Sequence, residues 1–251
     1  MHISIAAEPL FHLWGFPVTN SFLVSIIASM LIIILAFIIS KTLKTKPGSS
    51  QTVLEALVES GLNLVESVAG PAGRRFFPLF ATFFIFILLS NWIGLLPGFG
   101  SFGFNKIEEG HKVFVPFFRG ATADLNTTLA LAIISFAAME YFGFSTQKLG
   151  YLKHYFNLKS PIDFFVGFLE LVSDLAKIIS FAFRLFGNVF AGEVLLVVIS
   201  SLIPLIAPLP FFGLEIFVGL IQALVFSMLS LVFFNLASTS GHDKEVITVG
   251  H

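Results

Sequence analysis

Long apolar runs separated by short polar segments dominate this chain of 251 residues. An α-helix needs about 20 mostly apolar residues to cross the hydrocarbon core of a bilayer, and each of the main runs reaches that length. The pattern predicts five membrane-embedded helices, at approximately residues 21–40, 76–97, 124–144, 161–203 and 211–237. We therefore expect residues 1–251 to form a single all-α integral membrane domain.

The fourth run, residues 161–203, is too long for a simple crossing. As one helix it would extend for about 60 Å, roughly twice the thickness of the hydrocarbon core. We expect it to lie strongly tilted or to be broken. Gly187 and Gly192 are possible bends, although small residues also allow close packing between helices.

A further helical segment, residues 51–69, has a different pattern. Its apolar residues follow one side, whereas Glu55, Glu59 and Glu66 lie off that stripe. A helix of this kind lies on a membrane surface or against a partner rather than across the bilayer. We expect it at the cytoplasmic surface.

The positive charges indicate how the chain is oriented. Lys41, Lys44 and Lys46 directly follow the first predicted span, and short loops rich in lysine and arginine stay in the cytoplasm. The N-terminus then lies outside, residues 98–120 form an outside loop, and five crossings bring the C-terminus into the cytoplasm. The first 20 residues lack the pattern of a cleaved signal, so the first apolar run is expected to be a retained helix.

Composition supports a multi-pass membrane protein. Hydrophobic residues make up 56% of the chain, charged residues only 12%, and the mean hydropathy is +0.94, whereas about a quarter of the residues in soluble proteins are charged. A net charge of −1 gives no reason to expect nucleic acid as a partner. The lack of cysteine excludes disulfides and thiolate metal sites, and we expect no cofactor and no metal.

Arg184 is the most unusual residue of the sequence. It lies near the middle of the fourth run, with no carboxylate within four residues on either side. Arginine cannot lose its charge, and at bilayer depth it costs about 2.5–3.5 kcal/mol on insertion scales. It either snorkels from a helix end to the interface or is a fixed positive charge on an ion path. The long apolar sequence on both sides favours the second interpretation.

Other polar residues share a helical face with this arginine. At 100° per residue, spacings of seven, seven and four place Glu170, Lys177, Arg184 and Asn188 on one stripe. Glu193, nine residues after Arg184, points to nearly the opposite side unless the helix is distorted. A row of polar side chains thus extends along the fourth predicted helix toward Arg184.

The last predicted helix carries a second polar face with Glu215 and Gln222, seven residues apart. Carboxyl groups in a partly wet, low-dielectric setting can exchange protons near neutral pH, which makes a proton relay plausible. Pairing is the alternative: Asp174 with Lys177, three residues apart, and Glu193 or Glu215 with Arg184.

Three short stretches give the chain a family resemblance. Residues 184–193 read RLFGNVFAGE, residues 220–226 read LIQALVF, and residues 123–132 read ADLNTTLALA. With Glu170 fourteen residues before the arginine, they resemble the a subunit of the bacterial F-type ATP synthase membrane sector. The resemblance implies a surface helix and spanning helices, of which the last two form a long, tilted hairpin against a ring of c subunits.

The resemblance also implies a function, that of a proton-translocating stator whose two aqueous half-channels exchange protons with the carboxylates of the c-ring. Arg184 would be the essential arginine that draws a proton off each arriving carboxylate and blocks leakage between the half-channels. The outer half-channel would be lined by Asn188, Glu193, Glu215 and Gln222, with Asp124 near its mouth, and the cytoplasmic one by Glu170. Some relatives have histidine in place of Glu215 and vary at Glu193, which leaves the immediate proton donor open.

The implied partners are the c-ring, the b-subunit stator stalk, the remainder of the F-type ATP synthase and the lipid bilayer, in a bacterial inner membrane. Proton flow would be coupled to rotation and ATP synthesis. No phosphate-binding GxxxxGK[ST] motif occurs in the chain, so ATP chemistry is expected on other subunits and the chain itself is not expected to be catalytic.

Two other functions were considered. A secondary antiporter or transporter also places charges at mid-membrane, but such folds usually contain internal repeats, and the halves of this chain show no convincing repeat. A haem-bearing subunit needs histidines inside spanning helices, whereas the six histidines lie in predicted tails and loops. Both fit the sequence less well than the stator.

Overall fold

The computed structural model of the chain describes residues 7–13, 15–45, 47–96, 102–108, 111–148, 151, 161–203 and 206–239. Its principal helices in these ranges are α1 (Asn20–Thr42), α2 (Ser49–Ala69), α3 (Phe77–Gly94), α4 (Leu125–Gln147), α6 (Pro161–Leu202) and α7 (Pro208–Thr239). Two short 3-10 helices, η1 (Gly70–Arg75) and η3 (Ala121–Ala123), precede α3 and α4.

The prediction of an all-α membrane fold is confirmed. Five helices, α1, α3, α4, α6 and α7, are long and apolar enough to cross a membrane, and they coincide with the five predicted runs to within a few residues. The last begins at Pro208 rather than at residue 211, because proline is well tolerated in the first turn of a helix, where its missing N–H leaves no bond unmade.

Side-chain caps fix where two of the spanning helices begin. The hydroxyl of Thr19 accepts a hydrogen bond from the backbone N–H of Phe22 at 3.2 Å at the start of α1. The carboxylate of Asp124 accepts one from the N–H of Asn126 at 3.1 Å at the start of α4. Such caps satisfy N–H groups that have no partner within the helix.

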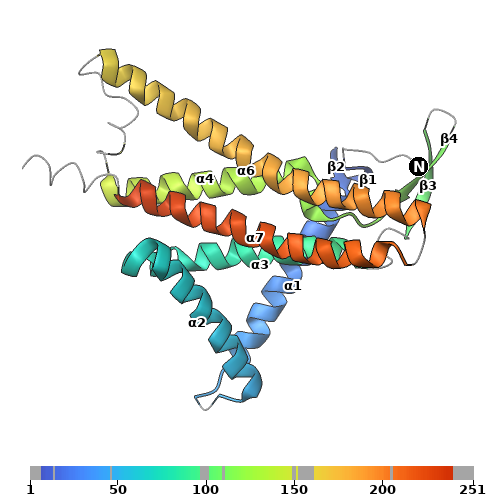
Figure 1. Cartoon of the computed structure of the whole chain (residues 1–251), viewed down its shortest axis with the longest axis horizontal. Coiled ribbons are helices and arrows are strands. Elements are labelled where there is room, and N and C mark those ends of the chain that lie inside the picture. Colours follow the sequence, from blue (N-terminus) through green and yellow to red (C-terminus); the bar gives the residue numbers. More distant parts are fainter. Residues whose placement is uncertain are drawn as a thin grey trace, which may run out of the picture.

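The core lies between α3, α4, α7 and the second half of α6 (Figure 1). Phenylalanine fills much of it, with Phe76 and Phe142 meeting edge to face at 4.8 Å between ring centroids, and Phe83 and Phe226 at 5.5 Å. Edge-to-face pairs are favourable for aromatic rings. Most of the aromatic content of this region therefore serves packing.

Helix α6 runs unbroken through all 42 residues from Pro161 to Leu202, so neither Gly187 nor Gly192 interrupts it. Figure 1 shows α6 inclined to α4 and α7, with its N-terminal half rising away from the bundle and its C-terminal half packed against it. Of the two expectations for this long run, a break is not found, and a strong tilt relative to the bilayer stays a prediction.

Helices α1 and α2 form a V that extends from one side of the bundle (Figure 1). In α2 only Val65 and Ala69 are buried, both near its C-terminal end, and Glu66 there pairs with Arg74 of η1. Its charges and its absence from the five apolar helices agree with the predicted amphipathic segment. Its place at the cytoplasmic surface stays a prediction.

Two β-hairpins were not predicted. β1 (Pro9–Leu13) pairs with β2 (Phe16–Thr19), and β3 (Gly103–Glu108) pairs with β4 (His111–Pro116), both antiparallel. They lie toward the same end of the molecule as the C-terminal end of α6 and the N-terminal end of α7 (Figure 1). The side-chain amide of Asn20 donates to the carbonyl of Pro116 at 3.2 Å and joins the two regions.

Candidate functional site

Arg184 lies on the outward side of α6, near the middle of that helix, and its side chain is exposed. Its contacts within the described chain are a hydrogen bond of 3.5 Å to the hydroxyl of Ser180 and the Phe181 ring, whose centroid is 6.0 Å from the guanidinium carbon. No carboxylate pairs with it in the part of the chain that the structure describes. The neighbouring Phe183 is 56% exposed, so this arginine stands on an apolar outer surface.

A polar bridge between α6 and α7 lies one turn from Arg184. The side-chain amide of Asn188 donates to the amide oxygen of Gln222 at 2.8 Å. Gln222 is buried, whereas Asn188 is exposed on the same side of α6 as the arginine. The structure thus brings together two of the predicted site residues from different helices.

Beyond this bridge, a cavity of about 330 Å³ lies between α3, α6, α7 and the segment that precedes α4. Glu193 of α6 and Glu215 of α7 both line it, together with Arg119 and Asn91. The two glutamates therefore share one space, as the predicted outer half-channel requires. They do not share it with Arg184, which faces the other way.

Arg119 was missed in the sequence analysis, which treated it as one of several charges in an outside loop. The structure buries this residue to 8% exposure and places its Nε 3.3 Å from Oε2 of Glu193. Its guanidinium carbon also lies 5.6 Å from the centroid of the Phe190 ring. The suggested pairing of Glu193 with Arg184 is therefore wrong, because Glu193 pairs with Arg119 instead.

Glu215 is 7% exposed and lies directly against the backbone of α6 at Gly192. A Cβ atom built on Gly192 would overlap the Glu215 carboxylate, so the carboxylate keeps this position only while residue 192 is glycine. No hydrogen bond or ion pair joins Glu215 to the rest of the described chain, which also removes the suggested pairing of Glu215 with Arg184. Gly192 thus leaves space for the Glu215 carboxylate and does not bend the helix.

Helix α3 holds the segment of α7 that carries Glu215. The side-chain amide of Asn91 donates to the carbonyl of Gly219 at 2.9 Å, and the indole N–H of Trp92 donates to the carbonyl of Ile216 at 3.2 Å. Thr122 of η3 in turn donates to Asn91. These bonds fix the wall of the cavity opposite α6.

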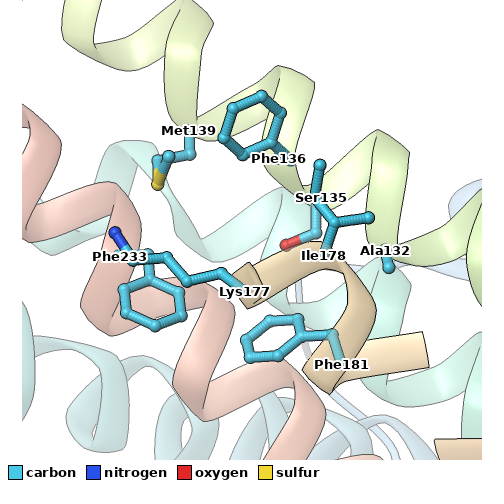
Figure 2. A pocket seen from close by; sticks show the side chains of 8 residues that line it. All are labelled: Ala132, Ser135, Phe136, Met139, Lys177, Ile178, Phe181 and Phe233. Carbon is cyan, nitrogen blue, oxygen red and sulfur yellow. The ribbon is translucent and has the colours of Figure 1, made fainter. Parts of the chain in front are cut away.

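Lys177, the other cation on the polar stripe of α6, is paired as predicted. Its Nζ lies 2.7 Å from Oδ1 of the buried Asp174 and 5.1 Å from the centroid of the Phe233 ring. Figure 2 shows Lys177 among side chains from three helices around a narrow space, namely Ala132, Ser135, Phe136, Met139, Ile178, Phe181 and Phe233.

Glu170 and Asp124, the two remaining predicted site residues, do not line the cavity that holds Glu193 and Glu215. Glu170 is half-buried on the N-terminal half of α6, four turns or about 21 Å from Arg184 along the helix. Asp124 caps α4 and lines a second cavity, of about 450 Å³, between α1 and α4. Ser25, Ser29 and Asn126 also line that second cavity.

Comparison with known proteins supports the family suggested by the sequence motifs. The sequence profile of the family described as "ATP synthase A chain" matches residues 22–235. The chain belongs to this family. The matched region includes the Arg184 stripe, the Asn188–Gln222 bridge and both cavity glutamates.

Curated relatives carry names that agree with this family. The chain is 36% identical over 206 residues to ATP synthase subunit a 3 of Pelobacter propionicus, which covers 81% of this chain and 80% of the relative. It is 35% identical over 215 residues to ATP synthase subunit a of Geotalea uraniireducens, with 84% of each chain covered. It is 34% identical over 226 residues to ATP synthase subunit a 1 of Syntrophotalea carbinolica, with 88% of each covered.

As a member of the ATP synthase A chain family, the protein is a multi-span component of the ATP synthase membrane sector. It assembles with the rest of that sector and serves ion transport linked to ATP synthesis. Family membership argues against the antiporter and the haem-bearing subunit.

Proposed function

We propose that the chain is the proton-translocating stator subunit of an F-type ATP synthase. In this function it provides two aqueous half-channels and an arginine, Arg184, that exchange protons with the carboxylates of a rotating c-ring. Proton flow through the half-channels drives rotation and thereby ATP synthesis on other subunits, so the chain itself is not catalytic.

The exposed and unpaired Arg184 carries this proposal. Its side chain stands on an apolar outer surface at mid-helix, where an unpaired charge facing lipid is costly. Within the described residues its neighbours are the hydroxyl of Ser180 at 3.5 Å and the ring of Phe181, and neither carries a negative charge. A carboxylate delivered by a neighbouring subunit would lose its proton on meeting the guanidinium, and it would have to regain a proton before moving on into lipid.

The cavity with Glu193 and Glu215 supports an outer half-channel. Its lining residues on α6 and α7 include Glu193, Leu196, Phe212 and Glu215. They belong to the C-terminal part of α6 and the N-terminal part of α7, which lie toward the end of the molecule that bears the hairpins (Figure 1), the predicted outside. The Asn188–Gln222 bridge lies between this cavity and the arginine along α6 and α7. The polar groups thus extend from the outer end of the bundle to the proposed ring surface.

Glu170 supports a cytoplasmic half-channel on the opposite side of Arg184, because it lies on the same stripe of α6 toward its other end. Asp124 lines the separate cavity beside α1, so we propose for it a place near the outer mouth and not within the chamber that holds the two glutamates. The amphipathic α2 and the exposed apolar sides of α1 and α6 are available to lipid, the b-subunit stalk and the c-ring. The proposed location is a bacterial inner membrane, with the N-terminus outside and the C-terminus in the cytoplasm.

The decisive experiment measures ATP-driven proton pumping in inverted membrane vesicles that contain the assembled complex. Arg184→Ala is expected to abolish pumping while the complex still assembles. Arg74→Ala is the matched control, because Arg74 is an exposed arginine outside the spanning helices and should leave pumping intact. Full pumping by the Arg184→Ala complex would reject the proposed role of Arg184 in the stator mechanism.

A further inference from the structure

We infer that the second cavity, between α1 and α4, binds one phospholipid whose headgroup carries a primary ammonium group, namely phosphatidylethanolamine. Asp124 binds the ammonium group, and the helix faces below it hold an acyl chain. The inference goes beyond the proposed function, because this cavity is separate from the one that holds Glu193 and Glu215. It is compatible with the outer position proposed for Asp124, since headgroups lie at the membrane interface.

The second cavity, of about 450 Å³, follows one face of each helix. Residues three or four positions apart in a helix share a face, and the lining residues of both helices have this spacing. They are Phe22, Ser25 and Ser29 on α1, and Thr127, Ala130, Leu131 and Ile134 on α4. The volume falls within the range of about 300–1,000 Å³ that is usual for small-molecule sites. The cavity is thus a groove along the two helices.

The length of this groove matches one leaflet of a bilayer. Its lining extends from Thr19 to Ser29 on α1 and from Asp124 to Ile134 on α4, and ten helical positions rise about 15 Å. That is half of the roughly 30 Å of hydrocarbon in a bilayer. Thr19 and Asp124 cap the N-terminal ends of α1 and α4, which lie toward the end of the molecule with the hairpins (Figure 1). The groove therefore spans the leaflet on that side.

Polar and apolar side chains are separated along the groove. The outer end is lined by Thr19, Asp124, Asn126 and Thr127, and the deeper part by Phe86, Leu131 and Ile134. The hydroxyls of Ser25 and Ser29 donate to backbone carbonyls of α1 at 2.7 and 2.8 Å. A buried water typically needs about three hydrogen-bonding partners, and the deeper part offers few. It suits a hydrocarbon chain better than water.

Asp124 supplies the charge that selects the headgroup. It is 4% exposed, lines the groove, and has no ion pair with the described residues. The backbone N–H and the side-chain amide of Asn126 both donate to Oδ1, at 3.1 and 3.3 Å, which leaves Oδ2 without a hydrogen bond. A buried carboxylate without a counter-charge is costly. A lipid ammonium group brings both the charge and N–H donors.

Two hydroxyl groups beside Asp124 suit the phosphate of the same lipid. The oxygen of Thr19 accepts from the N–H of Phe22, so its own proton remains available to donate, and Thr127 brings a second hydroxyl to the groove. Phosphatidylglycerol would place a phosphate near Asp124 without any cation, and like charges repel. The groove therefore selects phosphatidylethanolamine over phosphatidylglycerol.

Photo-crosslinking of the assembled complex tests the inference. The complex is reconstituted into phosphatidylglycerol vesicles with a trace of phosphatidylethanolamine, or of phosphatidylglycerol, that carries the same diazirine-bearing acyl chain. Mass spectrometry after illumination measures the lipid adducts on residues 17–29 and 124–134. We expect phosphatidylethanolamine to label these segments about tenfold more strongly than phosphatidylglycerol, because a hydrogen bond to a charged group favours binding by at least about that factor.

Two variants separate the headgroup from the acyl chain. Asp124→Asn removes the charge but keeps a good N-cap residue, so the labelling ratio of the two lipids should fall to about one. Ala130→Phe fills the groove and should lower labelling by phosphatidylethanolamine about tenfold. Ala137→Phe is the matched control, because Ala137 is exposed seven positions further along the same face of α4 and does not line the groove. It should label like the parent.

The inference is overturned if both lipids label the groove equally in the parent, which is the behaviour of lipid that merely surrounds the protein. It is also overturned if neither labels it, as expected when a helix of another subunit fills the groove. A preference that survives in Asp124→Asn would contradict the selection by charge. These outcomes do not depend on pumping, so they are distinct from failure of the proposed role of Arg184.

Discussion

Lys177 and Arg184 lie two turns apart on α6, yet the protein treats the two cations in opposite ways. Lys177 is neutralised by Asp174 at 2.7 Å and enclosed by side chains of α4 and α7. Arg184 faces outward among exposed apolar residues, and its one hydrogen bond to the described residues goes to the hydroxyl of Ser180. The chain is able to supply a carboxylate to a cation in this helix, and it does so where the cation serves packing. The arginine without one depends on a partner outside the chain.

Replacing arginine by lysine at position 184 should have the largest effect on ATP-driven pumping, and the reverse replacement at position 177 should have little. Arg184→Lys keeps a charge, but the ammonium is compact, lacks the planar fork of donors and can shed its proton when desolvated. Removal of a preorganised electrostatic group typically costs about 100-fold or more in rate, and we expect a loss of that size in ATP-driven pumping. The reverse change, Lys177→Arg, retains the partner Asp174 and should pump within about twofold of the parent. Equal losses in both variants would show that the surroundings of the two cations do not determine their roles.

A change at Gly192 extends the comparison from the two cations to the carboxylate of Glu215. Gly192→Ala places a methyl group where the Glu215 carboxylate lies, so the carboxylate must move, and a displaced proton-exchanging group should lower pumping about tenfold. Gly213→Ala is the matched control, because nothing lies within 4 Å of a Cβ atom there. Pumping assays on equal amounts of assembled complex measure the difference. Unaltered pumping by Gly192→Ala would mean that the position of the Glu215 carboxylate beside Gly192 has no functional importance.

The smallest expected effect concerns stability. Lys177→Met removes the ammonium group that lies 2.7 Å from the carboxylate of Asp174, a residue only 4% exposed, which should destabilise the assembled subunit by about 1–3 kcal/mol. Lys177→Met combined with Asp174→Leu should cost less than the single change, because replacing both members of a buried pair by apolar residues is often neutral. Thermal unfolding of the complex in detergent measures both. A double variant less stable than Lys177→Met would contradict a purely structural role for this pair.

The membrane architecture could be predicted from the sequence because lipid imposes a simple rule. Every backbone polar group must be satisfied within a spanning segment, so an apolar run of sufficient length is a helix, and the five runs became the five apolar helices. Periodicity also identified the amphipathic segment that became α2. It placed Asp174 and Lys177 on one face, where the structure pairs them.

Pairings between distant segments could not be predicted in this way. Helical periodicity relates residues along one helix, whereas Arg119 and Glu193 are 74 positions apart and belong to different segments. The only available signal was that Arg119 closes the polar outside loop just before the ATADLN stretch. The role of Gly192 could not be predicted either, because it depends on the position of Glu215, which lies on another helix.

The hairpins were overlooked for a different reason. Pro9 and Pro17 obscure the first hairpin, since proline disfavours regular strands. The second hairpin lies within residues 98–120, the predicted outside loop. Its polar composition had been interpreted only as a loop.

The uninterrupted length of α6 also has a mechanical consequence. Its C-terminal half packs against α4 and α7, whereas its N-terminal half projects from the bundle (Figure 1). The bundle therefore supports the helix mainly along its C-terminal half. A sideways load on the projecting half bends the helix most where its packing against α4 and α7 begins, and Lys177, Ile178 and Phe181 of α6 line the space shared with those helices. Lys177, which pairs with Asp174 and lies beside the ring of Phe233 (Figure 2), thus belongs to the supported part of the helix next to the projecting half.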